Sequence, residues 1–384
     1  MTGYVTLEWL VWIWLTVGLY WLAPRGARPF VLMGISLLFM GSVAPLSALI
    51  LIAFCGLTHV AGNVMKPSGR TIAAAAAIIV AVVVAFKVNQ TIDMQRPGAT
   101  ILIPLGLSYY SFRCLHFLIE RYKGRIAPMP LIEVASYLFF LPTFLIGPIH
   151  RFDTFHADRQ RQRFDPRLLS LGLERLVQGY AKIVILGNYG TGTLMGGYIA
   201  DLSDPSSAWA IYLGIVQSGL NLYFQFSGHT DIAIGFALLL GFRIMENFHW
   251  PYFQPNISAF WQSWHRSLSL WCREYIYGVV VAHTRSPALG ALSTMVVIGL
   301  WHEISLRFLL WGAYHGIALI VWQRWQDFKN ARNLSAPPAL AQPLYILSVL
   351  ATVHFVWFGF VILTAPSVGE ALDLFRRFAE ALQP

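Results

Sequence analysis

The chain has 384 residues, of which 57% are hydrophobic and only 12% are charged, and its formal net charge is +9. Soluble globular domains carry about 25% charged residues, so this deficit excludes an ordinary water-soluble fold and points to lipid as the solvent. In a membrane protein the positive charge is typical of cytoplasmic loops, and no RNA- or DNA-binding module accompanies it here.

Apolar runs long enough for membrane helices recur along the chain. The first, from Tyr4 to Leu22, lacks a preceding basic segment and a small-residue cleavage site, which indicates a membrane helix rather than a signal peptide. Residues 29–62 are too long for one span and break at 41–45, which predicts two short or tilted helices. The other predicted spans are 71–88, 101–119, 132–149, 208–226, 228–243, 288–301, 305–325 and 343–364, with the first at 5–23.

Two basic segments, 121–125 and 151–167, both resemble cytoplasmic loops. They cannot both be cytoplasmic if 132–149 crosses the membrane once, and Pro142 and Pro148 interrupt that run. A re-entrant segment resolves the conflict, and such broken backbone is tolerated only inside protein or beside water. Residues 168–187 are amphipathic and predict a further helix. We therefore expect an all-α, multi-pass membrane protein of about ten transmembrane or re-entrant helices, in a single domain covering 1–384.

The segment 246–287 is both aromatic and polar. Ser258 is the expected N-cap of a helix that begins at Ala259. On one continuous helix, one face would carry Trp261, Trp264, Leu268 and Trp271, and another would carry Arg266 and Arg273. This pattern is typical of an interfacial anchor or of a pocket wall inside a membrane protein.

Three histidines are candidates for chemistry, because ionisable groups in membrane segments are costly to bury and often functional. His302 closes an apolar helix, and an imidazole can act as a base near neutral pH. His265 comes from a different element and can converge on His302. His315 would lie about 20 Å from His302 if 302–315 formed one helix, so the two share a site only if the chain breaks between them.

Other constellations are weaker. Asp231 begins an apolar run, as a helix N-terminal cap or as part of a polar pocket. Ser108 and Ser111 lack a GxSxG elbow, and no P-loop or GxGxxG is present. His265, His302 and Glu303 lack the spacing of a zinc site, so we expect no metal. The scattered Cys55, Cys114 and Cys272 indicate buried thiols rather than a disulfide framework.

Several segments together resemble the membrane-bound O-acyltransferase (MBOAT) family, in particular its bacterial branch of alginate O-acetylases and teichoic-acid D-alanyl transferases. The matching motifs are PLGLSYYSF (104–112), LPTF (141–144), GPIHRF (147–152), YFQFSGHTDIAIG (223–235), ENF (246–248), FWQSWHRSLSLWCREY (260–275), GLWH (299–302) and WGAYHG (311–316). They run in order over about 104–316. Departures from the family pattern, such as His229, Glu274 and Glu303, leave the acyl donor open.

The resemblance implies helices around a central tunnel, with His302 as the catalytic histidine and His265 as the second active-site residue. Further members of the implied pocket are His315, Asp231, Asn247, Trp264, Ser267 and Arg273. Arg266 and Arg273 would contact the donor, an acyl carrier protein thioester or acyl-CoA, and no tightly bound cofactor is expected. The acceptor would be a hydroxyl of a cell-surface polysaccharide or teichoic-acid-like polymer, or a periplasmic transfer partner. The acyl group would be acetyl or D-alanyl.

This interpretation places the protein in the cell (inner) membrane and favours direct transfer, since no activated Ser or Cys nucleophile is visible. A transporter or flippase that uses the intramembrane histidines is the main alternative, although internal repeats are missing. A structural scaffold for polysaccharide export is a third class, and it needs no histidine. The sequence leaves open the acyl group, donor, acceptor polymer, helix count, oligomeric state and role of His315.

Overall fold

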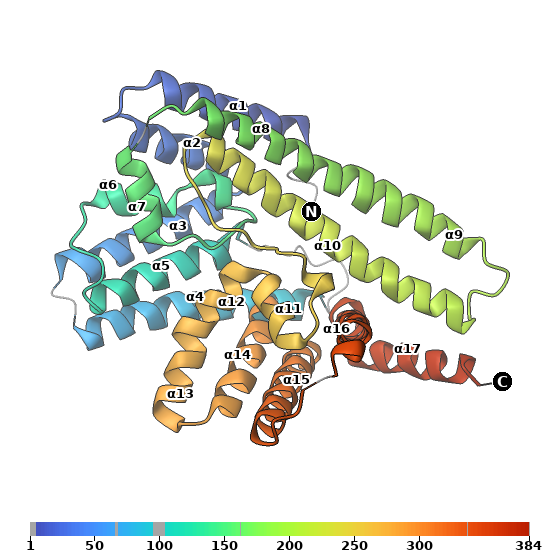
Figure 1. The fold of residues 1–384 in the computed structure, drawn as a ribbon. Coiled ribbons are helices and arrows are strands. Elements are labelled where there is room, and N and C mark those ends of the chain that lie inside the picture. Colours follow the sequence, from blue (N-terminus) through green and yellow to red (C-terminus); the bar gives the residue numbers. More distant parts are fainter. Residues whose placement is uncertain (1–4, 66–67, 95–103, 162, 336, 384) are drawn as a thin grey trace. The chain divides into compact units, whose positions relative to one another are not determined.

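The computed structural model describes residues 5–65, 68–94, 104–161, 163–335 and 337–383, and every regular element in those ranges is helical (Figure 1). The all-α prediction is therefore confirmed for this part of the chain. By length and composition, three of the described helical segments are long and apolar enough to cross a membrane: Pro45–Val64, Gly69–Ile92 and Pro338–Thr364. Shorter apolar helices are Leu7–Leu22, Arg28–Val43 and Pro287–His302. The count of about ten spans stays a prediction.

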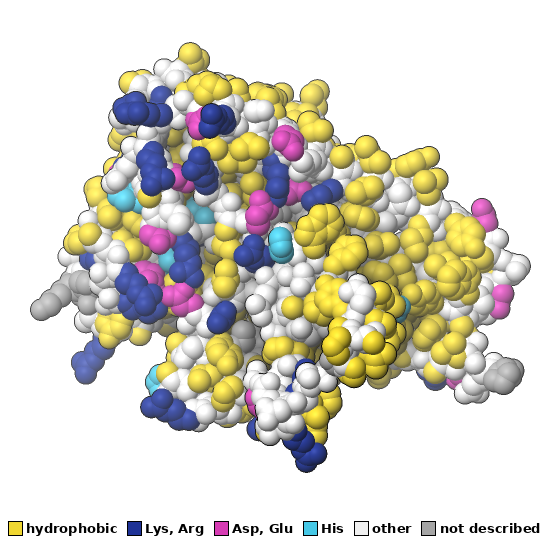
Figure 2. Space-filling view, viewed as in Figure 1, with side chains coloured by type: hydrophobic (Ala, Val, Ile, Leu, Met, Phe, Trp, Pro, Cys, Tyr) yellow, Lys and Arg dark blue, Asp and Glu magenta, His cyan; other side chains and the backbone are white. Residues whose placement is uncertain are grey.

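Large apolar side chains lie on the outside of the molecule in unusual number (Figure 2). Leu7 is 78% exposed and Leu22 is 84% exposed, both on the first helix, while Trp9, Ile13 and Tyr20 of the same helix are buried. Water-soluble monomers rarely expose wide apolar patches, whereas lipid tails solvate such a surface at no cost. The surface is therefore that of a protein embedded in a membrane.

The chain forms two compact units. Unit 1 comprises Met1–Tyr180 and Gly228–Glu246, and unit 2 comprises Ala181–Ser227 and Asn247–Pro384. This division follows contacts within the chain, so the single membrane domain expected over 1–384 stays a prediction.

Unit 1 holds the N-terminal helices. They are α1 (Leu7–Leu22), α2 (Arg28–Val43), α3 (Pro45–His59), η1 (Val60–Val64), α4 (Gly69–Met94), α5 (Leu107–Tyr122), α6 (Leu131–Leu138), η2 (Leu141–Thr143), α7 (Phe152–Arg161) and most of α8 (Pro166–Ala181). The predicted break of 29–62 at 41–45 is confirmed, because α2 ends at Val43 and Pro45 occupies the first turn of α3. The first predicted helix, at 5–23, corresponds to α1, which begins at Leu7. Tyr4 lies outside the described residues.

The predicted span 101–119 begins later, at Leu107. Gly106, with a φ of +73°, sets this start, and a Cβ there would lie 2.6 Å from the carbonyl oxygen of Phe144. Residues 101–103 lie outside the described residues.

The predicted span 132–149 is wrong as a continuous helix. α6 ends at Leu138, and the backbone then passes through the short turn η2 and non-helical residues to α7. The guanidinium of Arg113, fully buried, holds this segment by donating to the carbonyl oxygens of Tyr137 (3.1 Å) and Thr143 (3.3 Å). The Thr143 hydroxyl lies 3.0 Å from Nδ1 of His150. The broken backbone is confirmed, and a re-entrant path stays a prediction.

Replacement of Arg113 by Met should therefore destabilise the protein. The substitution leaves two buried carbonyls without these donors, at a cost of roughly 2–5 kcal/mol in the free energy of unfolding. The midpoint of thermal unfolding in detergent should fall, while Arg125→Met, at an exposed side chain, should leave it nearly unchanged. An unchanged midpoint for Arg113→Met would show that the segment is held by other contacts.

Unit 2 holds the C-terminal helices. They are η3 (Lys182–Met195), α9 (Gly196–Ala200), part of α10 (Ala208–Leu239), η4 (Pro251–Phe253), α11 (Ile257–Ser263), α12 (Arg266–Cys272), η5 (Arg273–Tyr277), α13 (Gly278–Thr284), α14 (Pro287–His302), α15 (Leu306–Ala331), α16 (Pro338–Thr364) and α17 (Val368–Ala381). The amphipathic run 168–187 is helical as predicted, and its helix continues as η3 and α9 to Ala200.

The two predicted spans 208–226 and 228–243 form one helix, α10, so the predicted break is wrong. Gly228 lies inside this helix and serves close packing instead of a turn. A Cβ on Gly179 of α8 would lie 2.7 Å from the Gly228 carbonyl oxygen, and one on Gly235 would lie 2.8 Å from that of Gly172. A glycine inside a helix costs about 1 kcal/mol relative to alanine, and the close approach of α8 and α10 offsets this.

Candidate active site

Three buried or partly buried histidines gather in unit 2, each on a different structural element. His265 joins α11 to α12, His302 is the last residue of α14, and His315 lies in the middle of α15. Aromatic side chains fill the space between them. The path from histidine to histidine can be followed through ring contacts.

His265 has a left-handed backbone, with a φ of 43°, and is 2% exposed. Such a conformation is uncommon for a residue other than glycine, and it often marks a functional site. It ends α11 at Ser263 and lets α12 begin at Arg266. The single helix predicted from Ala259 is therefore wrong.

The predicted N-cap of that helix is also wrong. Asn256 caps α11, because its side chain accepts a hydrogen bond from the backbone N–H of Ala259. Since the chain turns at His265, Trp261 and Trp271 do not share one continuous helical face.

A short loop holds the turn around His265. The backbone carbonyl of Asn247 accepts from the N–H of Arg266 (2.9 Å), and its side-chain Oδ1 accepts from the N–H of Ser267 (3.2 Å). The N–H of His249 donates to the carbonyl of Ser263 (2.9 Å). Asn247 and Ser267, two of the predicted supporting residues, are thus hydrogen-bonded to each other at the turn that contains His265, and both are buried.

Several polar atoms of this loop have no hydrogen-bond partner among the described residues. They are Nδ2 of Asn247, Oγ of Ser267 and both ring nitrogens of His265. A buried polar group without a partner costs about 1–3 kcal/mol, so such a group in a native protein calls for an explanation. A polar substrate that binds here would supply partners.

His302 lies at the turn between α14 and α15. Glu303 is extended, and the side chain of Ser305 caps α15 by accepting from the N–H of Phe308. A carboxylate oxygen of Glu303 accepts a hydrogen bond from Arg307 (2.8 Å) within the same turn. The chain therefore breaks between His302 and His315, which removes the separation expected for a single helix.

Two indole rings connect the three imidazoles. Trp301 lies 4.6 Å from the His302 ring and 6.2 Å from the His265 ring, between centroids. Trp311 lies 5.7 Å from the His302 ring and 4.8 Å from the His315 ring. The structure thus brings the two predicted catalytic histidines and His315 into one aromatic cluster.

His315 is enclosed by aromatic rings. It is fully buried, and its ring centroid lies 5.3 Å from Trp261, 5.2 Å from Tyr314 and 5.6 Å from Phe355. Neither ring nitrogen has a hydrogen-bond partner in the described parts of the chain. A Cβ on Gly359 of α16 would lie 3.0 Å from Nε2, so this glycine makes room for the imidazole.

The α14–α15 hairpin that carries His302 and His315 depends on close backbone contact. A Cβ on Gly299 would overlap the carbonyl oxygen of Phe308, and one on Gly312 would lie 2.5 Å from that of Met295. Glycine at both positions lets the two helices touch along their backbones. The spacing of the histidine cluster therefore rests on these glycines.

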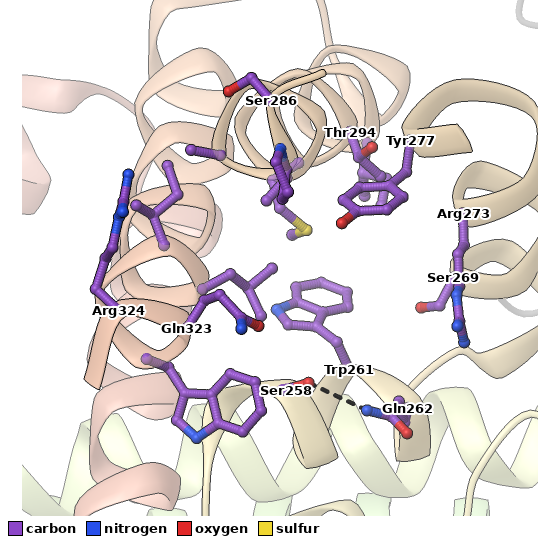
Figure 3. Close-up of a pocket in the computed structure, with 18 of the residues that line it drawn as sticks. Ser258, Trp261, Gln262, Ser269, Arg273, Tyr277, Ser286, Thr294, Gln323 and Arg324 are labelled. Carbon is purple, nitrogen blue, oxygen red and sulfur yellow. Dashed lines mark hydrogen bonds between the residues drawn. The ribbon is translucent and has the colours of Figure 1, made fainter. Parts of the chain in front are cut away.

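A cavity of about 820 Å³ lies beside this cluster (Figure 3). Its walls come from α11, the α12–η5 segment, α14 as far as Ile298 with the two residues before that helix, and the second part of α15. Arg273, Arg285, Arg324 and Asp327 supply charge, and Trp261 and Ile298 supply apolar surface. Of the two predicted donor contacts, Arg273 lines this cavity and Arg266 is not among its lining residues.

Sequence reasoning missed Arg285 and Arg324. Arg285 directly precedes Ser286, whose side chain caps α14, and Pro287 in the first turn of that helix. These two residues signal the start of a helix, so the sequence could have placed Arg285 at the N-terminal end of α14, whose C-terminal end carries His302. Arg324 carries no local signal, because only the antiparallel hairpin brings it back to that end.

The remaining predicted residues lie elsewhere. Asp231 is inside α10, in unit 1, and its carboxylate accepts from Arg175 (2.9 Å), so its role as an N-terminal cap is wrong. Arg175 also pairs with Glu246. Trp264 is 6% exposed and stacks on Phe260 with centroids 5.6 Å apart, which places it in the packed aromatic core of unit 2.

Comparison with known proteins gives a consistent result. The profile of MBOAT, the membrane-bound O-acyltransferase family, matches residues 4–358. A probable alginate O-acetylase of Pseudomonas aeruginosa is 32% identical over 281 residues, which cover 72% of this chain and 51% of that protein. A teichoic acid D-alanyltransferase of Streptococcus thermophilus is 28% identical over 311 residues, covering 74% of this chain and 73% of that protein.

A third relative is a peptidoglycan O-acetyltransferase of Helicobacter pylori, 26% identical over 309 residues that cover 72% of this chain and 56% of that protein. The chain spans about half the length of the alginate O-acetylases it matches. The three relatives differ in the acyl group or the polymer that their names give.

Proposed function

Because the chain belongs to the membrane-bound O-acyltransferase family, we propose that it moves a small acyl group, acetyl or D-alanyl, from a thioester to a hydroxyl. The acceptor is a cell-envelope polymer or its periplasmic transfer partner, as the names of the relatives suggest. The observation that carries this proposal is the cluster of His265, His302 and His315 next to a cavity with basic residues in its wall.

His302 is the general base of this reaction. A hydroxyl has a pKa far above 7, so its oxygen attacks a thioester efficiently only when a base takes its proton. The oxygen then bonds to the carbonyl carbon, the carbon–sulfur bond breaks, and the thiolate takes the proton back from the imidazolium. No covalent acyl-enzyme is required.

His265 binds the acceptor or stabilises the transition state of the same reaction. Its buried ring nitrogens, with Nδ2 of Asn247 and Oγ of Ser267, supply groups that can hold the acceptor or the developing oxyanion. Donors of this kind typically contribute 10²–10³ to the rate.

The donor enters through the cavity. Arg273, Arg285 and Arg324 provide positive charge for the phosphates of coenzyme A or for an acidic acyl carrier protein. Arg266 was predicted for the same contact and lies at the start of α12, about two helical turns before Arg273. The donor is a cosubstrate, and the acyl group crosses the cell (inner) membrane through the protein without its carrier.

The function is tested with membrane vesicles that contain the protein and a thioester labelled in its acyl group. Vesicles with wild-type protein should convert the label into an alkali-labile ester, and the acid released by alkali identifies the acyl group. Vesicles without the protein should not. A protein that moves unmodified thioester or sugar without forming an ester would instead be a transporter.

Replacement of Gly359 by Ala should lower this activity. The added methyl carbon would lie 3.0 Å from Nε2 of His315 and 2.9 Å from the ring of Tyr314, so it presses on both side chains. Small displacements of a catalytic cluster cost about tenfold or more in rate. Gly214→Ala is the matched control, because a Cβ there meets no atom within 4 Å. Equal activity of both variants would remove His315 from the working site.

A further inference from the structure

The cavity follows one face of α14. Its lining residues on that helix include Ala288, Ala291, Met295 and Ile298, which recur at intervals of three or four and therefore share a face. His302 is four residues beyond Ile298, so it continues the same face about 6 Å further along the helix axis. The cavity thus points along the hairpin toward His302.

The cavity stops short of the histidines. None of His265, His302 and His315 is among the residues that line it. Trp261 belongs both to the wall of the cavity and to the aromatic cluster around the histidines. It lines the cavity, and its ring lies 5.3 Å from His315 and 5.8 Å from Trp311, the ring that contacts His302.

Figure 3 shows Trp261 projecting from α11 into the middle of the space, with Gln323 and Arg324 on one side and Ser269 and Arg273 on the other. The indole is 8% exposed, and its Nε1–H has no hydrogen-bond partner among the described residues.

We propose that Trp261 closes the inner end of the cavity and sets the length of the acyl group that can reach His302. This inference rests on the proposed function and adds a specificity-determining residue to it. A thioester arm occupies the cavity, and only the acyl group passes the indole. Because this bulky, rigid ring stands between the cavity and the histidine cluster, a two- or three-carbon acyl group passes it and longer chains are rejected.

Trp261→Leu should therefore accept longer acyl groups. Vesicles with each variant receive acetyl, propionyl, butyryl and hexanoyl thioesters of pantetheine and of coenzyme A, and the free thiol formed is measured. Thiol formed in His302→Ala vesicles is subtracted. One methylene in a binding pocket is worth about 10–200-fold in discrimination, so the butyryl-to-acetyl ratio should rise at least tenfold.

Trp322→Leu is the matched control, because Trp322 lines the same cavity on the second part of α15. It should leave the ratio unchanged. Trp261→Phe should shift the ratio in the same direction by a smaller factor, and it replaces the Leu variant if that protein fails to accumulate in the membrane.

The outcomes separate the two proposals. Wild-type turnover that depends on His302, with an unchanged chain-length ratio in the Trp261 variants, overturns this inference alone. An equal shift in the Trp322 variant also overturns it. Absence of any His302-dependent turnover in wild-type vesicles overturns the proposed function instead.

Discussion

His302→Ala should reduce thioester turnover by about 10²–10⁴-fold, the usual contribution of a general base. The substitution removes the imidazole but leaves α14 intact, because His302 is its last residue and Ser305 independently caps α15. Thermal unfolding in detergent should therefore change little. The loss should fall mainly on kcat, since the proton transfer belongs to the transition state.

His59→Ala is the control for this experiment. His59 ends α3 in unit 1, and its Nδ1 lies 3.3 Å from Nδ2 of Asn63 in the next turn. Its removal should leave turnover within about twofold of wild type, since it takes away a partly exposed side chain that belongs neither to the histidine cluster nor to the lining of the cavity. If the His302 variant retains full turnover while its amount in the membrane matches wild type, His302 is a structural histidine and the proposed mechanism is wrong.

Gly299→Ala should also abolish most activity, by a different physical route. The added methyl group overlaps the Phe308 carbonyl oxygen and meets the backbone nitrogen of Gly312, neither of which can rotate away. The two helices must separate, and His302, three residues later, moves with them. Overpacking of this kind costs about 1–3 kcal/mol of stability, and the displaced base costs roughly 10²-fold in rate.

Gly56→Ala is the control, because it makes the same glycine-to-alanine change inside a helix without a close backbone contact. Gly56 lies inside α3, and an added Cβ would meet no atom within 4 Å, so the change should be neutral or slightly stabilising. Turnover and the unfolding midpoint are measured for both variants. Unchanged turnover in Gly299→Ala would show that the position of His302 does not depend on close contact in the hairpin.

Local signals predicted much of the fold. Pro45 occupies the first turn of a helix and cannot continue one, so the break between α2 and α3 could be predicted from the sequence. Long apolar runs predicted α1 and α14 to within two residues at both ends. They also predicted the start of α15 and the end of α16, although α15 continues beyond its predicted end and α16 begins before its predicted start. These features depend on residues close in sequence.

Features that depend on distant contacts could not be predicted in this way. Gly228 resembles a helix break, but its role is contact with Gly179 of another helix. Nothing near His265 signals a left-handed backbone, because the hydrogen bonds that fix the turn come from Asn247. His302 and His315 share one cluster only because the chain turns between α14 and α15. Ser305 signals this turn as the N-cap of α15, but the apolar residues on both sides of it resemble one continuous helix.

The candidate site shows the same division. The family motifs named His265 and His302, and the structure adds that Trp301 and Trp311 connect them to each other and to His315. Arg285 and Arg324 became candidates only through the cavity, since the hairpin brings residues that are far apart in the sequence to one end.

The most direct test of the proposed function measures the ester-linked acyl groups of the cell envelope in a strain that lacks this protein. The strain is complemented with wild type, His302→Ala or His59→Ala, and the amount of each protein in the membrane is checked. We predict that wild type and His59→Ala restore the esters and that His302→Ala leaves them at the level of the deletion. Full restoration by His302→Ala would contradict the proposal that this histidine carries out acyl transfer.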